Sequence, residues 1–153
     1  MPCYSAIDRK NVTASANDTV ENVLRTMDKE GVKTAAIFDD EGDFIGIFSK
    51  NILLKNLIPV SVVTSGDVQI DMKIEAAPGI AKRLNKVMPL PVYDLMERKP
   101  TKVRLDDPIW EGVSQLTKRG EPLCVVDEKG KYHGMITYES LVNDLQNMDT
   151  SDS

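Results

Sequence analysis

Two hydroxyl side chains stand where a short apolar segment is followed by a helix-like pattern. Ser49 follows the apolar residues 44–48, and Thr137 follows residues 132–136. The first N–H groups of a helix have no partner within the helix, and the peptide dipoles make that end positive, so a hydroxyl there suits a bound phosphate. Serine and threonine also cap helices without any ligand, and the sequence leaves both alternatives open.

The surroundings of the two hydroxyls differ. Lys50 follows Ser49 and adds a positive charge for a phosphate, whereas Tyr138 follows Thr137 and adds none. Each hydroxyl is preceded, three residues earlier, by a glycine in a predicted strand. Such a glycine permits a bend or a close approach by another group, which is either a ligand or a packed part of the chain.

Other reactive residue types show no arrangement that supports catalysis or metal binding. His133 has no neighbouring serine or cysteine in a nucleophile motif, and Cys3 and Cys124 lack the spacing of metal ligands. The acidic turns at 39–42 and 127–130 lack the alternating oxygen ligands of a calcium loop, and they are predicted to be solvated hairpin turns. We therefore expect no enzyme and no metal.

Length and charge narrow the class of protein. The 153 residues carry 19 basic and 24 acidic side chains, for a net charge of −5, and 41% of the residues are hydrophobic. This composition is typical of a globular protein, and a net acidic chain without an arginine-rich patch disfavours nucleic-acid binding. Because no apolar run reaches the ~18 residues of a membrane span, we expect a cytoplasmic protein with no nucleic acid and no membrane as partners.

The two hydroxyls belong to a repeated sequence. Residues 42–49 recur as residues 130–137, and the displacement is 88 positions, as between Gly46 and Gly134 (134 − 46). A repeat of this kind is one supersecondary unit used twice. The residue pattern of each copy predicts a short strand, a helix, a hairpin of two strands and a second helix.

A copy of roughly 55 residues is marginal alone, so we expect the two copies to share one core. Asp18 and Asp107 are predicted to cap the first helix of each copy. The predicted fold class is α+β, with two β-α-β-β-α repeats packed as one pseudo-symmetric module and a long helical and loop connection. The predicted domains are the first repeat at 1–59, a connecting segment at 60–91 with a helix through 80–88, the second repeat at 92–148, and a disordered tail at 149–153.

The paired pattern resembles the cystathionine-β-synthase (CBS) domain. The second copy carries Val-Tyr-Asp-Leu-Met at 92–96, Val-Val-Asp at 125–127 and Gly-Met-Ile-Thr at 134–137. The first copy carries Ile-Phe-Asp at 37–39 and Gly-Ile-Phe-Ser at 46–49. The tandem occurrence, rather than any one of these motifs, carries the resemblance.

The resemblance implies a regulatory module that binds AMP, ADP, ATP or S-adenosylmethionine in clefts between the two repeats. It implies no required cofactor, a homodimer, and an effector protein that senses whether the ligand is bound. The phosphate is expected near Thr137 or Ser49, and the adenine near apolar strand residues. The expected ligand-binding residues are Thr137, Ser140, Gly134, Leu123, Ser49, Lys50, Gly46 and Ala35.

The chain departs from the family pattern where an aspartate commonly accepts hydrogen bonds from the ribose. Three residues beyond the hydroxyls lie Ile52 and Ser140. Losing a hydrogen bond to a charged group costs roughly 1.5–3 kcal/mol, or about ten- to a hundredfold in affinity. Ser140 keeps a hydroxyl acceptor, so the copy with Thr137 is the preferred site. The departure also supports an alternative, a ligand-free structural, dimerisation or docking module with degenerate nucleotide sites.

Overall fold

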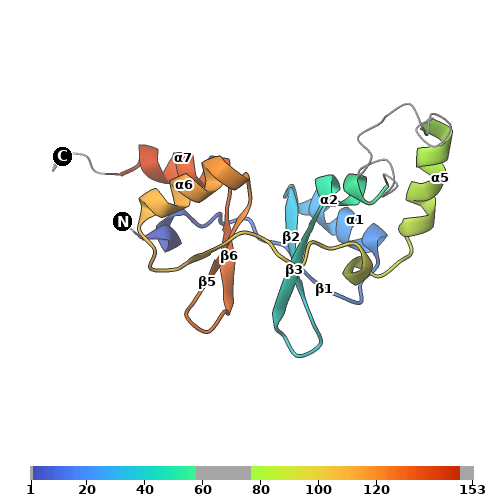
Figure 1. Ribbon diagram of the computed structural model, residues 1–153, viewed down its shortest axis with the longest axis horizontal. Helices are drawn as coiled ribbons and strands as arrows, with labels where there is room; N and C mark the ends of the chain where they lie inside the picture. Colours follow the sequence, from blue (N-terminus) through green and yellow to red (C-terminus); the bar gives the residue numbers. More distant parts are fainter. Residues whose placement is uncertain (1, 58–76, 149–153) are drawn as a thin grey trace. The chain divides into compact units, whose positions relative to one another are not determined.

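The computed structural model describes residues 2–57 and 77–148, and these residues form two compact units (Figure 1). The continuous unit is Val12–Arg98. The split unit joins two separate stretches of chain, Met1–Asn11 and Lys99–Ser153. No helix in the described ranges is both long and apolar enough to cross a membrane.

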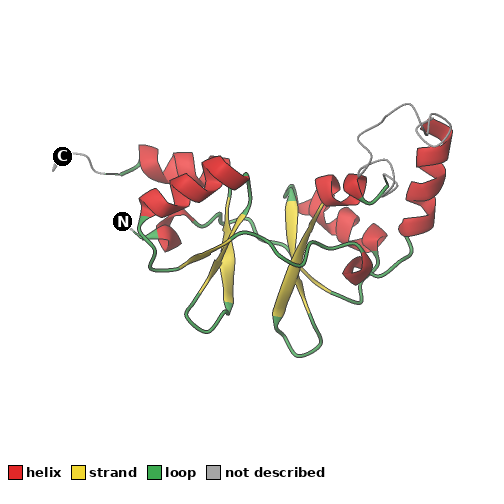
Figure 2. Ribbon diagram, in the orientation of Figure 1, coloured by secondary structure: helices red, strands yellow, loops and turns green. Residues whose placement is uncertain are grey.

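The continuous unit has helices on a three-stranded sheet (Figure 2). Its elements are β1 (Thr13–Ser15), α1 (Val20–Glu30), β2 (Thr34–Phe38), β3 (Phe44–Ser49), α2 (Lys50–Lys55), α5 (Ala77–Val87) and the 3-10 helix η2 (Val92–Asp94). The strand order is β1-β2-β3, with β1 parallel to β2 and β2 antiparallel to β3. The short strand predicted at the start of the first copy and the predicted connecting helix are therefore confirmed, whereas the predicted loop around 60–76 lies outside the described residues.

The split unit repeats this topology. Its elements are the 3-10 helix η1 (Cys3–Ala6), β4 (Lys102–Arg104), α6 (Ile109–Arg119), β5 (Leu123–Val126), β6 (Tyr132–Ile136) and α7 (Tyr138–Gln146). The strand order is β4-β5-β6, again with one parallel and one antiparallel pair. The α+β class and the β-α-β-β-α order of each repeat are thus confirmed.

The first helix of each repeat begins one residue later than predicted. Thr19 is the N-cap of α1, and its Oγ1 accepts a hydrogen bond from the Asn22 N–H at 3.2 Å, while Pro108 occupies the N-cap position of α6. The carboxylates of Asp18 and Asp107 each accept a hydrogen bond from a backbone N–H three residues earlier in the chain, that of Ser15 and that of Arg104. The predicted aspartate caps are wrong because these carboxylates close the turn between strand and helix instead.

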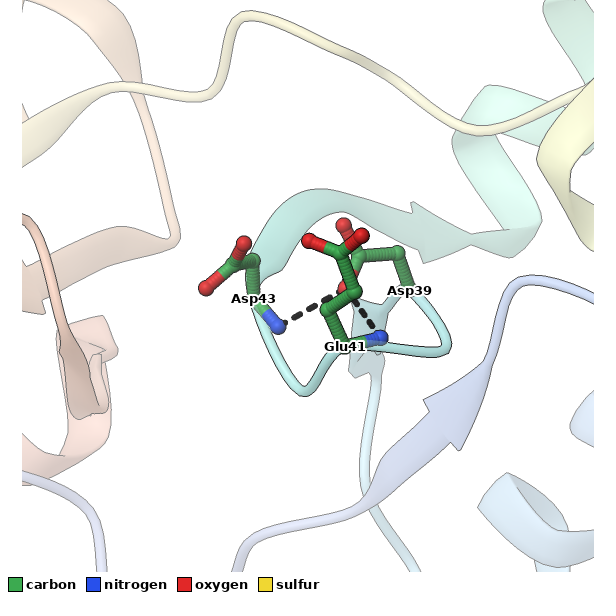
Figure 3. A group of neighbouring side chains, drawn as sticks. All are labelled: Asp39, Glu41 and Asp43. Atoms are coloured by element: carbon green, nitrogen blue, oxygen red, sulfur yellow. Dashed lines mark hydrogen bonds between the residues drawn. The ribbon is translucent and has the colours of Figure 1, made fainter.

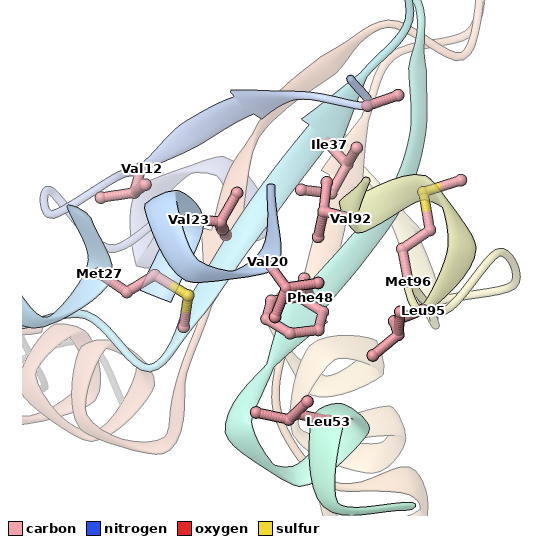
Figure 4. Packing of buried hydrophobic residues seen from close by; sticks show 12 residues of the cluster. Val12, Val20, Val23, Met27, Ile37, Phe48, Leu53, Val92, Leu95 and Met96 are labelled. Atoms are coloured by element: carbon pink, nitrogen blue, oxygen red, sulfur yellow. The ribbon is translucent and has the colours of Figure 1, made fainter. Parts of the chain in front are cut away.

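The core of the continuous unit lies between the sheet and α1 (Figure 4). Helix α1 contributes Val20, Val23 and Met27, which repeat at helical spacing and are fully or almost fully buried. The strands contribute Phe48 from β3 and smaller residues from β2. Burying one such aliphatic or aromatic side chain contributes about 1.5–3 kcal/mol, so this cluster stabilises the unit.

The split unit has a separate core of its own. Its buried members are Cys3, Ala6, Val103, Leu116, Leu123, Val125, Ile136 and Leu141. Each unit thus has its own cluster of described buried apolar residues. The expectation that the two copies share one core stays a prediction. The apolar side chains of α7 are only partly buried, because Leu141 lies in the core whereas Val142 and Leu145 remain exposed.

Each unit is completed by the opening residues of the other predicted repeat. The N-terminal segment, Met1–Asn11, belongs to the split unit, where Cys3 and Ala6 enter the core. Residues 92–98, at the start of the second predicted repeat, belong to the continuous unit, where Val92, Leu95 and Met96 enter the core. The exchange supplies each small sheet with the apolar residues that its own copy lacks.

Candidate functional site

The hydroxyl of Thr137 caps helix α7 in the split unit. Its Oγ1 accepts a hydrogen bond from the Ser140 N–H at 3.1 Å, and Ser140 Oγ accepts one from the Thr137 N–H at 2.9 Å. The two residues therefore form a reciprocal capping box. An N-cap of this kind stabilises a helix by roughly 1 kcal/mol, so both predicted ligand-binding residues have a structural role that needs no ligand.

Two carboxylates lie at the same end of α7. The Thr137 hydroxyl donates to Asp8 Oδ2 at 3.1 Å, and the Tyr138 N–H donates to Glu121 Oε2 at 2.8 Å. Negative groups at this position are stabilised by the helix dipole. Sequence reasoning found neither residue, because only the folded split unit brings Asp8 beside a threonine 129 positions away.

The predicted site before α2 also has internal partners for its polar groups. Ser49 Oγ accepts a hydrogen bond from the Ile52 N–H at 3.2 Å, at the start of a helix of only six residues. Lys50 Nζ forms an exposed ion pair with Asp28 Oδ1 at 2.9 Å. The Ile52 side chain packs partly buried against the core of the continuous unit. The lysine that was expected to face a phosphate thus pairs with a carboxylate on α1.

The glycines of β3 and β6 each lie against the segment that completes their unit. Gly46 lies against residues 96–97, and Gly134 lies against Ile7. A Cβ on Gly46 would lie 2.6 Å from the backbone oxygen of Glu97 and 3.0 Å from Met96 Sδ. A Cβ on Gly134 would lie 2.5 Å from Ile7 Cγ2. The shortest distance at each glycine is below van der Waals contact, so close packing of the chain itself requires glycine at these two positions.

The last two predicted ligand-binding residues lie inside the strands. Ala35 on β2 and Leu123 on β5 have no exposed surface, and each belongs to the core of its unit. The neighbouring Cys124 is also buried, and burial raises the pKa of its thiol to about 12. A thiol with so high a pKa is neutral near pH 7 and therefore a poor nucleophile.

Three carboxylates gather in the turn between β2 and β3 (Figure 3). The carboxylate oxygens lie within 4.8 Å of one another and belong to Asp39, Glu41 and Asp43. Asp39 Oδ1 accepts hydrogen bonds from the backbone N–H groups of Glu41 and Asp43. Asp127 makes the same two backbone bonds in the β5–β6 turn, where lysines replace the other acidic residues. A bond to His133 Nε2 at 3.0 Å further lowers the pKa of Asp127 to about 2. Both turns are hairpin turns, as predicted, closed by the aspartate.

Fold and site together define a class of protein, an α+β chain with two matching β-α-β-β-α repeats whose glycine-containing strands lead into hydroxyl-capped helices. The family model of the CBS domain matches residues 5–59 and 92–147. The chain therefore belongs to the CBS domain family and carries two CBS domains in tandem. No curated protein matches the sequence.

Solved structures show the same fold at low sequence identity. A CBS domain-containing protein from Bacillus anthracis is 14% identical over 97% of this chain and 95% of that chain, with a TM-score of 0.70. CBSX2 from Arabidopsis thaliana is 19% identical over 94% of this chain and 91% of that chain, with a TM-score of 0.68. The chain in a crystal structure of CBSX2 in complex with AMP is 20% identical over 95% of this chain and 96% of that chain. Its TM-score is also 0.68.

Proposed function

We propose that this protein is a regulatory module that binds an adenosine-containing ligand and signals its occupancy to a partner protein. The observation that carries the proposal is the tandem CBS match, because a protein of the same fold, CBSX2, has been crystallised with AMP. CBS-pair proteins are generally regulatory, so the proposal includes no catalytic step. The candidate ligands are AMP, ADP, ATP and S-adenosylmethionine.

The preferred location for the ligand is the junction between β6 and α7. Thr137, Ser140 and Asp8 are half-buried there, so their polar atoms lie near the surface of the split unit. Helix α7 has nine residues against six in α2, and Ser140 stands where α2 has an isoleucine. The junction with Ser49, Lys50 and Gly46 is the second proposed location.

Isothermal titration calorimetry of the whole chain with the four candidate ligands tests the proposal. We expect at least one to bind, and we expect Ser140→Ala to weaken that binding about tenfold because a ligand hydroxyl loses its acceptor. Thr19→Ala removes a similar cap from α1, outside both proposed locations, and is expected to leave the affinity unchanged. No heat from any of the four ligands at millimolar concentration would refute the proposal.

A second candidate function is dimerisation or docking without a ligand. Thr137 and Ser49 already cap helices, which favours this alternative. The split unit also exposes large apolar side chains on η1, α6 and α7, and Trp110 has 66% of its surface exposed. Such side chains are enriched at protein interfaces, in keeping with the homodimer that the resemblance implies.

The dimer is tested by sedimentation equilibrium without nucleotide. We expect the mass of two chains, and we expect Trp110→Ser to shift the equilibrium toward one chain. Leu54→Ser is the matched control, because Leu54 is similarly exposed but lies on α2 of the continuous unit. A single-chain mass for the unmodified protein at about 100 μM would contradict the homodimer, since that corresponds to a dissociation constant weaker than most stable interfaces give.

A further inference from the structure

Helix α5 carries its positive charges on the side that faces solvent. Leu84 and Val87 pack against the core of the continuous unit. The exposed side of the helix carries Lys82, Arg83 and Lys86. Lys86 follows Lys82 by four residues and Arg83 by three, so the three charges are neighbours on the helix surface. Together they form the basic face of α5.

The basic face of α5 has no carboxylate partner among the described residues. Helix α5 contains no acidic residue, and none of its three cations forms an ion pair or a hydrogen bond with another residue in the described part of the chain. An exposed cation elsewhere in the unit does pair with a carboxylate, as Arg25 does with Glu21. Like charges three or four residues apart on a helix repel each other. A partner with carboxylates would therefore relieve this repulsion as well as form ion pairs.

The β2–β3 turn presents a negative surface of similar size (Figure 3). Asp40, Glu41 and Asp43 are exposed there, and no ion pair joins any of them to a described cation. Carboxylate oxygens of Glu41 and Asp43 lie within 4.8 Å of each other, a distance at which like charges repel. Asp39 serves the turn itself, because it accepts the backbone N–H groups of Glu41 and Asp43. Asp40, Glu41 and Asp43 therefore form an acidic turn whose charge no described cation neutralises.

The two surfaces do not meet within one chain. The acidic turn lies at the tip of the β2–β3 hairpin, and α5 lies at the opposite end of the continuous unit (Figure 1). Both are held in place, because α5 packs against the core and Asp39 closes the turn. Each surface is therefore available to another molecule with the complementary charge. A second copy of this chain carries both charges.

We propose that the basic face of α5 binds the acidic turn of a second copy of this chain. Three cations then meet three carboxylates, which relieves the like-charge repulsion on both surfaces. The contact joins two different surfaces, so each copy keeps a free surface for a further copy and the association continues head to tail. Exposed ion pairs contribute little each, so we expect a weak contact, in the millimolar range, that is steered by charge and screened by salt.

Charge-reversed variants of the whole chain test this contact. The helix variant replaces the basic face of α5 by Lys82→Glu, Arg83→Glu and Lys86→Glu. The turn variant replaces the acidic turn by Asp40→Lys, Glu41→Lys and Asp43→Lys. Static light scattering measures the weight-average mass at about 1 mM protein without nucleotide, in about 20 mM and in about 0.5 M salt, between which screening increases strongly. EDTA in every sample prevents divalent cations from bridging the carboxylates.

We expect the mass of the unmodified protein to be about twofold higher in low salt than in high salt, as for an open chain of copies at a concentration near the dissociation constant. Neither variant alone is expected to show this rise, because its two surfaces carry like charges. An equal mixture of the two variants is expected to regain the rise, since each surface of one variant then meets the opposite charge on the other.

The matched control lies on the split unit and changes three exposed cations, with Lys118→Glu, Arg119→Glu and Lys129→Glu. It has the same net charge as the helix variant but keeps both surfaces, so it is expected to keep the rise in mass. If a charge-reversed variant fails to fold, Lys82→Gln with Lys86→Gln removes charge without reversing it and is expected to reduce the rise.

The result is independent of nucleotide binding and of a dimer formed through the split unit. No nucleotide is present, and Trp110 lies outside the unit that carries the two surfaces, so a dimer through Trp110 adds the same mass to every sample. An unmodified protein with the same mass in both salts would overturn the proposed contact. A mixture of the helix and turn variants no heavier than either variant alone would also overturn it, and both outcomes would leave the proposed function intact.

Discussion

Gly46→Ala is expected to destabilise the protein by about 2–3 kcal/mol, as overpacking of a tight contact does. The new methyl group would lie 2.6 Å from the Glu97 backbone oxygen. Ile47 and Glu97 hold that backbone in place through two hydrogen bonds, of 3.0 and 2.8 Å. Because the obstacle is backbone, shortening the nearby Met96 side chain to alanine is not expected to restore the lost stability.

Gly134→Ala provides the matched comparison in the split unit. Its methyl group would meet a side-chain atom, Ile7 Cγ2, at 2.5 Å, and Gly134 also has a φ of 150°, which alanine adopts with strain. We expect a similar loss of about 2–3 kcal/mol. Ile7→Ala removes the clashing atom, so the double variant is expected to recover at least about 1 kcal/mol of the sum of the single effects.

Urea unfolding of the single and double variants measures both effects. Gly42→Ala is the control for replacing a glycine with positive φ, because nothing lies within 4 Å of the Cβ that it would add. Gly42→Ala is expected to cost only the backbone strain, about 1 kcal/mol. If Gly46→Ala cost no more than this control, or if Gly134→Ala and Ile7→Ala were simply additive, the close approach of the exchanged segments would be contradicted.

Deleting residues 2–8 is expected to loosen the split unit far more than the continuous one. The deletion removes Cys3 and Ala6 from the core and uncovers Gly134 where Ile7 lies against it. Losses of buried side chains of this kind sum to at least about 3 kcal/mol. Hydrogen exchange followed by mass spectrometry is the measurement, and β5 amides are expected to lose about a hundredfold or more in protection.

The control for this deletion is Arg9→Ser. Arg9 lies in the same N-terminal segment but is exposed, so its replacement is expected to leave the exchange of β5 unchanged. The β2 amides provide the internal reference, because β2 lies in the core of the other unit. Equal loss of protection in β2 and β5 would contradict the assignment of the N-terminal segment to the split unit.

The local order of elements could be predicted from the sequence because it depends on short-range patterns. The apolar spacing of Val20, Val23 and Met27 defines a helix face, and Gly31 ends that helix with a φ of 68°. The repeat of residues 42–49 at 130–137 predicted two similar hairpins, which the structure contains. The cap positions were missed by one residue, since an aspartate can close a turn as readily as it caps a helix.

The partners of the site residues could not be predicted in the same way. Thr137 and Ser140 were found from their place before a helix, and their capping box follows from local geometry. Asp8 was missed because its contact with Thr137 depends on which segment completes which sheet, and no local pattern encodes that choice. Lys50 was interpreted by its charge alone, whereas the structure pairs it with Asp28.

The exchange of segments also sets an order of events during protein synthesis. A ribosome makes the chain from the N-terminus, so every residue of the continuous unit has been made once Arg98 is added. Met1–Asn11, by contrast, is made before the whole continuous unit, and the residues that complete its own unit begin only at Lys99. At about 5–20 residues per second, the 87 residues from 12 to 98 (98 − 11) that separate the two parts take roughly 4–17 seconds to make. Residues 1–11 are therefore made before the continuous unit but reach their own partners only after it.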